Sequence, residues 1–196
     1  MEYIKLSEVC HTIGRGKAIT KSIDGDVYAL GFTDISFIKT RSGSGRGRMT
    51  PKCKLQNEYE DLKMYNIEIM DIVLPPITRK NLYLKLVKAL EENEKVIYSS
   101  RAIYIRVNKE KYSPNFLYKL LSTEKYKKRL LEEAYTKSTS ENTFQISIAK
   151  LKEFEIPKIS IDKQEEILQE EQKITEEFDE IIKTKEQELK ALYKKF

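Results

Sequence analysis

The chain has 196 residues, enough for one domain with an extension or for two small domains. Hydrophobic residues make up 40% of it, with seven Phe and twelve Tyr, so it can bury a core and is not a disordered chain. No apolar run approaches the ~18 residues of a membrane span, and the first residues lack an apolar signal segment. Cys10 and Cys53 lie far apart without CxxC spacing, which favours free thiols in a reducing compartment. We therefore expect a cytoplasmic protein.

The charge is unevenly placed along the chain. The whole sequence carries a net charge of +5, but residues 162–196 hold 11 acidic residues and 7 lysines, a net charge of −4. Residues 1–161 therefore carry +9. This surplus indicates a polyanion partner for the N-terminal part and a protein partner for the C-terminal part. On charge alone, a generic basic protein without such a partner is the alternative.

The first half of the chain predicts short strands separated by loops. Residues 1–14 are expected to form a short strand or turn and then a brief helix, which Ser7 caps and Gly14 ends. Residues 14–17 are expected to form a loop. Strands are predicted at 27–32, 35–38 and 67–74, and Pro75-Pro76 stops the last of them.

Residues 39–54 are of low complexity, with six basic residues, no acid and three of the seven glycines. This composition cannot pack a core and predicts a mobile loop. Its bases favour DNA binding, because Lys neutralises phosphates and Arg can also grip guanine O6 and N7. A solvated loop without a ligand is the alternative. The candidate residues are Lys39, Arg41, Arg46, Arg48, Lys52 and Lys54.

Two shorter loops add candidate DNA-binding residues. One follows the di-proline and contains Arg79, Lys80 and Asn81; the other is Ser99-Ser100-Arg101, with Arg101 as its candidate. Asn81 has the donor and acceptor needed to read adenine bidentately, although a single Asn is usually a turn former.

The second half predicts an alternation of strands and helices. Leu82, Leu86 and Leu90 have helical spacing, so a helix is expected within 81–90. Tyr126 and Leu130 are expected to face the core from a helix whose basic residues at 125–129 offer a face for phosphates. The remaining predictions are strands at 96–98 and 102–107, helices at 114–121 and 125–135, a polar loop at 136–143 and a strand at 144–148.

The C-terminal segment predicts one long helix. Pro157 marks the end of the first domain, Asp162 is a good N-cap, and nothing breaks a helix from there to Phe196. We therefore expect domains at 1–157 and 158–196. About 30 helical residues span roughly 45 Å. The apolar residues form one narrow stripe typical of a two-helix coiled coil, although a helix folded back on its own domain is the alternative. The stripe residues are Ile167, Ile174, Phe178, Ile181, Leu189, Leu192 and Phe196.

These features in this order resemble the specificity (S) subunits of type I restriction–modification enzymes. The resemblance covers essentially the whole chain and is most specific at the junction of the two domains. Two departures stand out: Ser138-Thr139-Ser140 lacks the glycine of the family's loop, and the chain holds one recognition domain and one helix instead of two of each. The matching segments are Ile4–Val9 with Ile13 and Gly14, Asp71–Leu74, Asn115–Leu121, and the junction Gln145, Ile148, Leu151, Ile156-Pro157, Gln164-Glu165 and Ile167.

The resemblance implies an α+β target recognition domain followed by a coiled-coil helix that pairs antiparallel with a second copy. It implies a half-subunit, whether natural, truncated or engineered, that reads double-stranded DNA as an inverted repeat. It also implies methyltransferase (M) and restriction (R) subunits as partners, with S-adenosylmethionine bound by the methyltransferase and no cofactor in this chain. The recognised bases and the choice between a homodimer and a paralogous partner stay open.

Motifs for catalysis are missing from the sequence. Pro75-Pro76 has neither the acid or amide before it nor the aromatic residue after it that an adenine methyltransferase needs. The glycines at 43–47 and 14–16 complete neither a GxGxxG nor a P-loop motif, and His11 has no second ligand at metal spacing. We expect a non-catalytic chain without a metal site. An RNA-binding or interaction module with a pairing helix, or the recognition piece of another split restriction enzyme, are the alternatives.

Overall fold

The computed structural model describes residues 2–18, 27–37, 52–53, 59–79, 81–88, 90, 95–137 and 143–193. The chain divides into two compact units, residues 1–158 and residues 159–196. The sequence places this boundary one residue earlier, between 157 and 158. The first unit contains all the strands described below, and the second contains one long helix.

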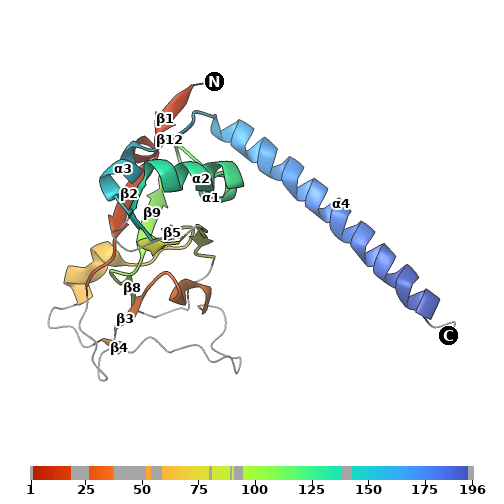
Figure 1. Ribbon diagram of the computed structural model, residues 1–196, viewed down its shortest axis with the longest axis horizontal. Helices are drawn as coiled ribbons and strands as arrows, with labels where there is room; N and C mark the ends of the chain where they lie inside the picture. Colours follow the sequence, from red (N-terminus) through yellow and green to blue (C-terminus); the bar gives the residue numbers. More distant parts are fainter. Residues whose placement is uncertain are drawn as a thin grey trace. The chain divides into compact units, whose positions relative to one another are not determined.

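The strands and helices alternate irregularly along the first unit (Figure 1). The strands are β1 (Tyr3–Lys5), β2 (Cys10–Arg15), β3 (Val27–Leu30), β4 (Lys52–Cys53), β5 (Ile72–Leu74), β6 (Ile77–Thr78), β7 (Lys85–Leu86), β8 (Val96–Tyr98), β9 (Ile103–Val107), β10 (Tyr135–Lys137), β11 (Phe144–Ile146) and β12 (Glu155–Pro157). The α-helices are α1 (Pro114–Ser122), α2 (Glu124–Glu133), α3 (Ile148–Glu153) and, in the second unit, α4 (Ile161–Tyr193). Short 3-10 helices occupy Leu6–Glu8, Asp34–Phe37 and Tyr59–Tyr65.

The strands form four small sheets. The largest has the order β2-β9-β5-β7, with antiparallel neighbours throughout. In a second sheet β3 pairs antiparallel with β4 and parallel with β8. The other two have the orders β10-β11-β6 and β1-β12. In Figure 1, β3, β4 and β8 lie at one end of the first unit, and β1 and β12 lie at the other.

Strand β9 is the centre of the first unit. Ile103, Ile105 and Val107 are buried, and the strand pairs with β2 on one side and β5 on the other. Such a continuous apolar strand is typical of a sheet covered on both faces. The apolar run of this strand is interrupted once, at Arg106, whose side chain is 17% exposed.

A buried ion pair fixes β9 to the turn that precedes β5. Arg106 donates two hydrogen bonds to the Asp71 carboxylate, of 3.0 and 2.9 Å, and a third to the Asn66 carbonyl. Asp71 is 1% exposed and also accepts from the Tyr98 hydroxyl and from the Glu68 backbone N–H. Every oxygen of this carboxylate therefore has a donor, which a buried charge requires.

The aromatic residues of β8 and β9 extend this network into the core. The Tyr98 and Tyr104 rings stack with centroids 4.5 Å apart. Burial, and then the Asp71 charge, raise the pKa of Tyr98 well above its ordinary value, so its hydroxyl remains a donor. The carboxylate, the guanidinium and the two rings thus join β8, β9 and the 66–71 turn.

Side-chain caps define the helices of the first unit. Ser113 accepts a hydrogen bond from Phe116 N–H at the start of α1, where Pro114 occupies the first turn. Thr123 ends α1 and caps α2 by accepting from Tyr126 N–H. Ser147 caps α3 in the same way through Lys150 N–H.

Helix α4 is continuous over 33 residues, which corresponds to about 50 Å at 1.5 Å per residue. Its side chains from 169 to 193 are exposed. Near its start, Gln164 is buried and donates from Nε2 to the Ile159 carbonyl. In the part of the chain that the structure describes, no helix is long and apolar enough to cross a membrane.

Several predicted elements are confirmed. The α+β class with a long C-terminal helix is observed. The strands predicted around β3, β8, β9 and β11 and the helices predicted around α1 and α2 are present. Tyr126 and Leu130 are buried as expected from α2.

The predicted helix before Gly14 is wrong. Only Leu6–Glu8 form a 3-10 turn, and Cys10–Arg15 form β2, including the start of the predicted 14–17 loop. Pairing with β9 outweighs the local capping signal, because tertiary context overrides propensity in short segments. The predicted helix at 81–90 is also wrong: the described residues 81–88 and 90 contain β7 and no helix. Leu82 and Leu84 are both buried, so this segment follows the period of two of extended chain.

Several smaller predictions are corrected. The predicted strand at 35–38 is a 3-10 helix, because the Asp34 carboxylate accepts from Gly31 N–H and closes a turn. The strand predicted at 67–74 shrinks to β5, since Met70 adopts a φ of 76° in a turn. Parts of two predicted loops form strands: β4 lies within 39–54, and β10 takes the first two residues of 136–143 together with Tyr135, the last residue of the predicted helix 125–135. Helix α3 was not predicted. Because α4 begins at Ile161, Asp162 lies in its first turn instead of at the N-cap, where its charge still favours the helix dipole.

We expect Asp71→Asn to lower the free energy of unfolding by about 3–5 kcal/mol, because Arg106, whose side chain is only 17% exposed, would lose its buried charge partner and keep only the exposed Glu68. Urea denaturation followed by tyrosine fluorescence measures this. The control is Glu68→Gln, which removes the exposed partner of the same guanidinium and should cost less than about 1 kcal/mol. Equal effects of the two substitutions would contradict the central role of the buried pair.

Candidate nucleic-acid interface

The predicted DNA-binding residues that the structure describes fall on two surfaces. Arg79 and Asn81 lie in the segment after β6, and Arg101 lies in the turn between β8 and β9. Lys52 belongs to β4, where its backbone pairs with Tyr28. The predictions for Lys39, Arg41, Arg46, Arg48, Lys54 and Lys80 lie outside the described residues.

The segment from Ile77 to Tyr83 presents alternate side chains outward. Ile77, Arg79, Asn81 and Tyr83 are exposed, whereas Thr78 and Leu82 are buried. The Thr78 hydroxyl donates to the Asn81 carbonyl and so fixes the bend between them. Arg79 and Asn81 therefore share an outer face with two large side chains, Ile77 and Tyr83, that the sequence analysis did not select.

A shallow groove of about 370 Å³ separates this segment from α2. Asn81 and Tyr83 line one side, and Lys127 and Lys128 line the other. Lys127 pairs with Glu124 at 2.9 Å, and Lys128, 79% exposed, lies 4.0 Å from the Glu132 carboxylate. The groove thus combines an amide, a phenol and two lysines that have acidic neighbours on the same helix, and amide, phenol and ammonium groups are among those that contact bases and phosphates.

The basic residues of α2 differ in their surroundings. The lysines lie at the surface, whereas Arg129 packs against a buried ring. Arg129 forms a bidentate ion pair with Glu133 and lies over the Phe154 ring at 4.8 Å. This guanidinium holds α2 to the segment before β12 and is not available as a phosphate ligand.

The β8–β9 turn, residues 99–102, is the second surface. The Arg101 side chain is 61% exposed, and its guanidinium lies 4.0 Å from the Asp34 carboxylate. Arg15, at the end of β2, donates from Nε to the Ser100 carbonyl at 2.8 Å. Lys17 is exposed beside them, and its backbone bonds to Tyr98 and Ser100. The structure therefore brings Arg15 and Lys17, which the sequence analysis treated only as part of a loop, against the turn that carries Arg101.

Gly16 makes this packing possible. A Cβ atom at this position would lie 2.3 Å from the carbonyl oxygens of both Tyr98 and Ser99. The Gly16 N–H donates to the Ala102 carbonyl, so the backbone lies directly against the turn. Glycine is required here because any side chain would push the 14–17 segment away from the turn.

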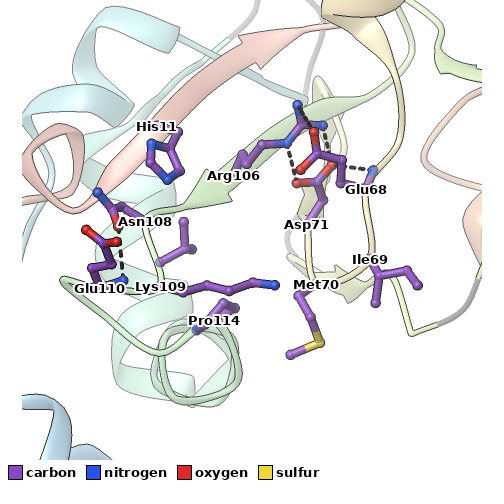
Figure 2. A pocket seen from close by; sticks show the side chains of 11 residues that line it. His11, Glu68, Ile69, Met70, Asp71, Arg106, Asn108, Lys109, Glu110 and Pro114 are labelled. Atoms are coloured by element: carbon purple, nitrogen blue, oxygen red, sulfur yellow. Dashed lines mark hydrogen bonds and ion pairs between the residues drawn. The ribbon is translucent and has the colours of Figure 1, made fainter.

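A charged pocket of about 310 Å³ lies near the opposite end of β9 (Figure 2). Figure 2 shows the Arg106 guanidinium pointing toward Asp71 and Glu68, while His11 and Glu110 lie on the other side of the pocket. Both Asp71 oxygens accept hydrogen bonds, Oδ1 from Arg106 and Oδ2 from Arg106, the Tyr98 hydroxyl and the Glu68 backbone N–H. The carboxylate at the edge of this pocket therefore belongs to the network that holds β8, β9 and the 66–71 turn together.

The neighbouring Cys10 is not a reactive thiol. Burial raises its pKa to about 12, so the neutral thiol predominates at neutral pH and the nucleophilic thiolate is rare. Among the residues that the structure describes, no three of the types His, Cys, Asp and Glu are clustered so as to hold a metal ion.

The apolar stripe of α4 is exposed. Ile174, Phe178 and Ile181 are 47%, 61% and 57% exposed, and Leu189 and Leu192 are similarly uncovered. Ile167 is half-buried, and Phe196 lies outside the described residues. Ile182 and Tyr193, 54% and 70% exposed, border the stripe and were not predicted.

The stripe recurs every eleven residues. Ile167, Phe178 and Leu189 are spaced by eleven, and so are the pair Ile181 and Leu192 and the pair Ile182 and Tyr193. An eleven-residue period corresponds to 3.67 residues per turn. The stripe therefore stays on one side of a helix that is straight or that follows a slight right-handed supercoil. A search for this period would have found Ile182 and Tyr193 in the sequence.

Sequence comparison finds neither a matching family model nor a similar curated protein. Comparison of structures does find similar chains. The HsdS subunit from Thermoanaerobacter tengcongensis matches with a TM-score of 0.56 and 19% identity, over 92% of this chain and 43% of that one. The type I restriction–modification system S subunit from M. genitalium matches with a TM-score of 0.50 and 13% identity, over 85% and 36%.

The fold is that of the type I S subunits. The match includes most of this chain, so the single domain and the long helix both take part in it. The chain spans less than half the length of each of these S subunits.

We expect Gly16→Ala to destabilise the first unit by about 1–3 kcal/mol, because the backbone must move to relieve the overlap with Tyr98 and Ser99. Thermal and urea denaturation measure the loss. Gly31→Ala is a graded control, since its Cβ would meet the Arg101 Cβ at 3.0 Å, where a small shift suffices. An equally stable Gly16→Ala protein would contradict the close contact.

Proposed function

We propose that this chain is the DNA-recognition specificity subunit of a type I restriction–modification system and has no catalytic activity of its own. The S-subunit fold over most of the chain carries the proposal. The charge of the sequence supports it, because residues 1–161 hold a net +9, as expected of a protein that binds a polyanion. In this proposal residues 1–157 are the target recognition domain and residues 158–196 the spacer helix, and the protein works in the cytoplasm.

The proposed partner of α4 is the same helix of a second copy. The exposed apolar stripe provides the contact. The charges favour an antiparallel arrangement: residues 162–180 hold nine acids and two lysines, whereas residues 181–196 hold two acids and five lysines. In an antiparallel pair each acidic half faces a basic half, whereas a parallel pair would align like charges.

A twofold axis across such a pair sets the form of the target. The two recognition domains would have inverted orientations, so the dimer would read an inverted repeat. The helix pair would fix the length of an unread spacer between the half-sites. A paralogous partner helix would give a bipartite but non-palindromic target.

The chemistry is assigned to other subunits. Methyltransferase subunits with S-adenosylmethionine would flip and methylate an adenine in each half-site, and a restriction subunit would cut unmodified DNA. This chain would supply only the recognition of the DNA target, through the candidate DNA-binding residues within 39–54 and 79–81 and at position 101.

Selection from a random duplex library with the purified full chain tests DNA recognition. We expect an enriched inverted repeat with a fixed spacer, because two identical domains would be held at a constant separation. Substitution of both Arg46 and Arg48 by Ala should weaken duplex binding by about 1–3 kcal/mol if a base is gripped. Preference for single-stranded RNA, or no duplex binding at low salt, would refute the proposed function.

Light scattering tests the dimer. We expect twice the chain mass of 23.0 kDa for the wild type at micromolar concentration and a monomer for Phe178→Glu with Ile181→Glu, which place charges in the stripe. Gln187→Glu is the matched control, because helical geometry places this exposed residue on the opposite face. A wild-type chain that stays monomeric at high micromolar concentration would remove the dimer.

Energy transfer between dyes tests the orientation. Lys190→Cys in a background with Cys10→Ser and Cys53→Ser provides one reactive site per chain. Antiparallel helices place the two dyes far apart along a helix of about 50 Å, whereas parallel helices place them side by side. Strong transfer within the dimer would rule out the inverted arrangement.

A further inference from the structure

The β8–β9 turn lies beside positively charged residues from another segment of the chain and carries one of its own. Arg15 comes from the end of β2, Lys17 from the residues after it, and Arg101 from the turn itself. The sequence does not reveal this cluster, because Arg101 lies 84 positions after Lys17. The register of β2 on β9, which pairs Arg15 with Ile103, brings them together.

Backbone hydrogen bonds hold this turn from two sides. On one side Lys17 N–H donates to the Tyr98 carbonyl at 2.9 Å, and Ser100 N–H donates to the Lys17 carbonyl at 2.8 Å. On the other side Phe32 N–H donates to the Arg101 carbonyl, and Ser99 N–H donates to the Leu30 carbonyl. The backbone of the turn is therefore held in place by neighbouring segments on both sides.

The cationic groups themselves remain accessible. Lys17 is exposed, and the Arg101 side chain is 61% exposed with Asp34 at the outer limit of ion pairing, 4.0 Å away. The Asp34 oxygen that faces Arg101 also accepts from Gly31 N–H at 2.8 Å, so it steers the guanidinium without neutralising it fully. Arg15 uses Nε to hold the Ser100 carbonyl, which leaves its terminal nitrogens for a ligand.

We propose that Arg15, Lys17 and Arg101 form a preorganised phosphate-binding site that fixes one strand of duplex DNA against the recognition domain. This inference rests on the proposed function and assigns the turn a positioning role, distinct from base reading. Phosphate contacts set the register and orientation of a protein on DNA, and base contacts set its sequence preference. Cations on a rigid frame suit the first task, because little conformational entropy is lost when they bind.

The neighbouring elements are consistent with this role. The 3-10 helix Asp34–Phe37 and strand β4 flank the basic segment of the sequence, and Asp34 contacts Arg101 while β4 pairs with β3.

The salt dependence of binding to one fixed duplex tests the site. We expect Arg101→Ala and Lys17→Ala each to weaken binding several-fold for all duplex sequences alike. Each should lower the slope of log affinity against log salt by about 0.9, the value for one lost phosphate contact. Arg101→Lys should retain most of the affinity, because a phosphate needs a charge and not the planar fork that reads guanine.

Lys109→Ala is the matched control. Lys109 is exposed and follows the far end of β9, and the five residues of this strand alone span roughly 17 Å. It should leave affinity and slope unchanged. An unchanged slope in Arg101→Ala and Lys17→Ala would overturn the phosphate site while leaving DNA recognition intact. Loss of binding in Arg101→Lys together with an altered selected sequence would instead make Arg101 a base reader, and a wild type that binds no duplex would overturn both proposals.

Discussion

The ion pair between Arg106 and Asp71 is the constraint around which the first unit is organised. It places a charge in the middle of the buried strand β9, and that charge is tolerated because Asp71, Asn66 and Glu68 supply acceptors around the guanidinium. The same carboxylate binds Tyr98, so the pair also sets the position of β8. With β8 and β9 fixed, the short turn between them has little freedom, and it is this turn that carries Arg101.

The two ends of β9 serve different purposes. Near Val107 the pocket of Figure 2 includes the Asp71 carboxylate, and both of its oxygens accept hydrogen bonds from within the fold. At the Ile103 end the carbonyl groups of the turn accept from backbone N–H groups and, at Ser100, from the Arg15 side chain, while the cationic side chains are left exposed. Polar groups at one end therefore stabilise the fold, and those at the other end are available for a polyanion.

The second unit follows a different physical rule. Helix α4 has no core of its own, so its apolar residues gain stability only when another surface covers them. Its charges also separate along the axis, acidic toward the N-terminus and basic toward the C-terminus. This order favours the dipole of a single helix and, at the same time, an antiparallel contact with a copy of itself. The two effects do not compete, so the same order of charges would stabilise both the single helix and the proposed helix pair.

The sequence by itself determined the long helix, the apolar stripe, the uneven charge and the strongly periodic helices around Tyr126 and Leu130. These features depend on local periodicity and capping, which neighbouring residues define. It also sufficed to suggest Arg79, Asn81 and Arg101 as exposed polar residues. Only the tertiary structure decided that residues 10–15 form a strand, that residues 81–88 are extended, and that Arg15 and Lys17 lie beside Arg101. Each of these depends on pairing with β5 or β9 across long stretches of sequence, and the energy of such pairing comes from partners that a local pattern cannot specify.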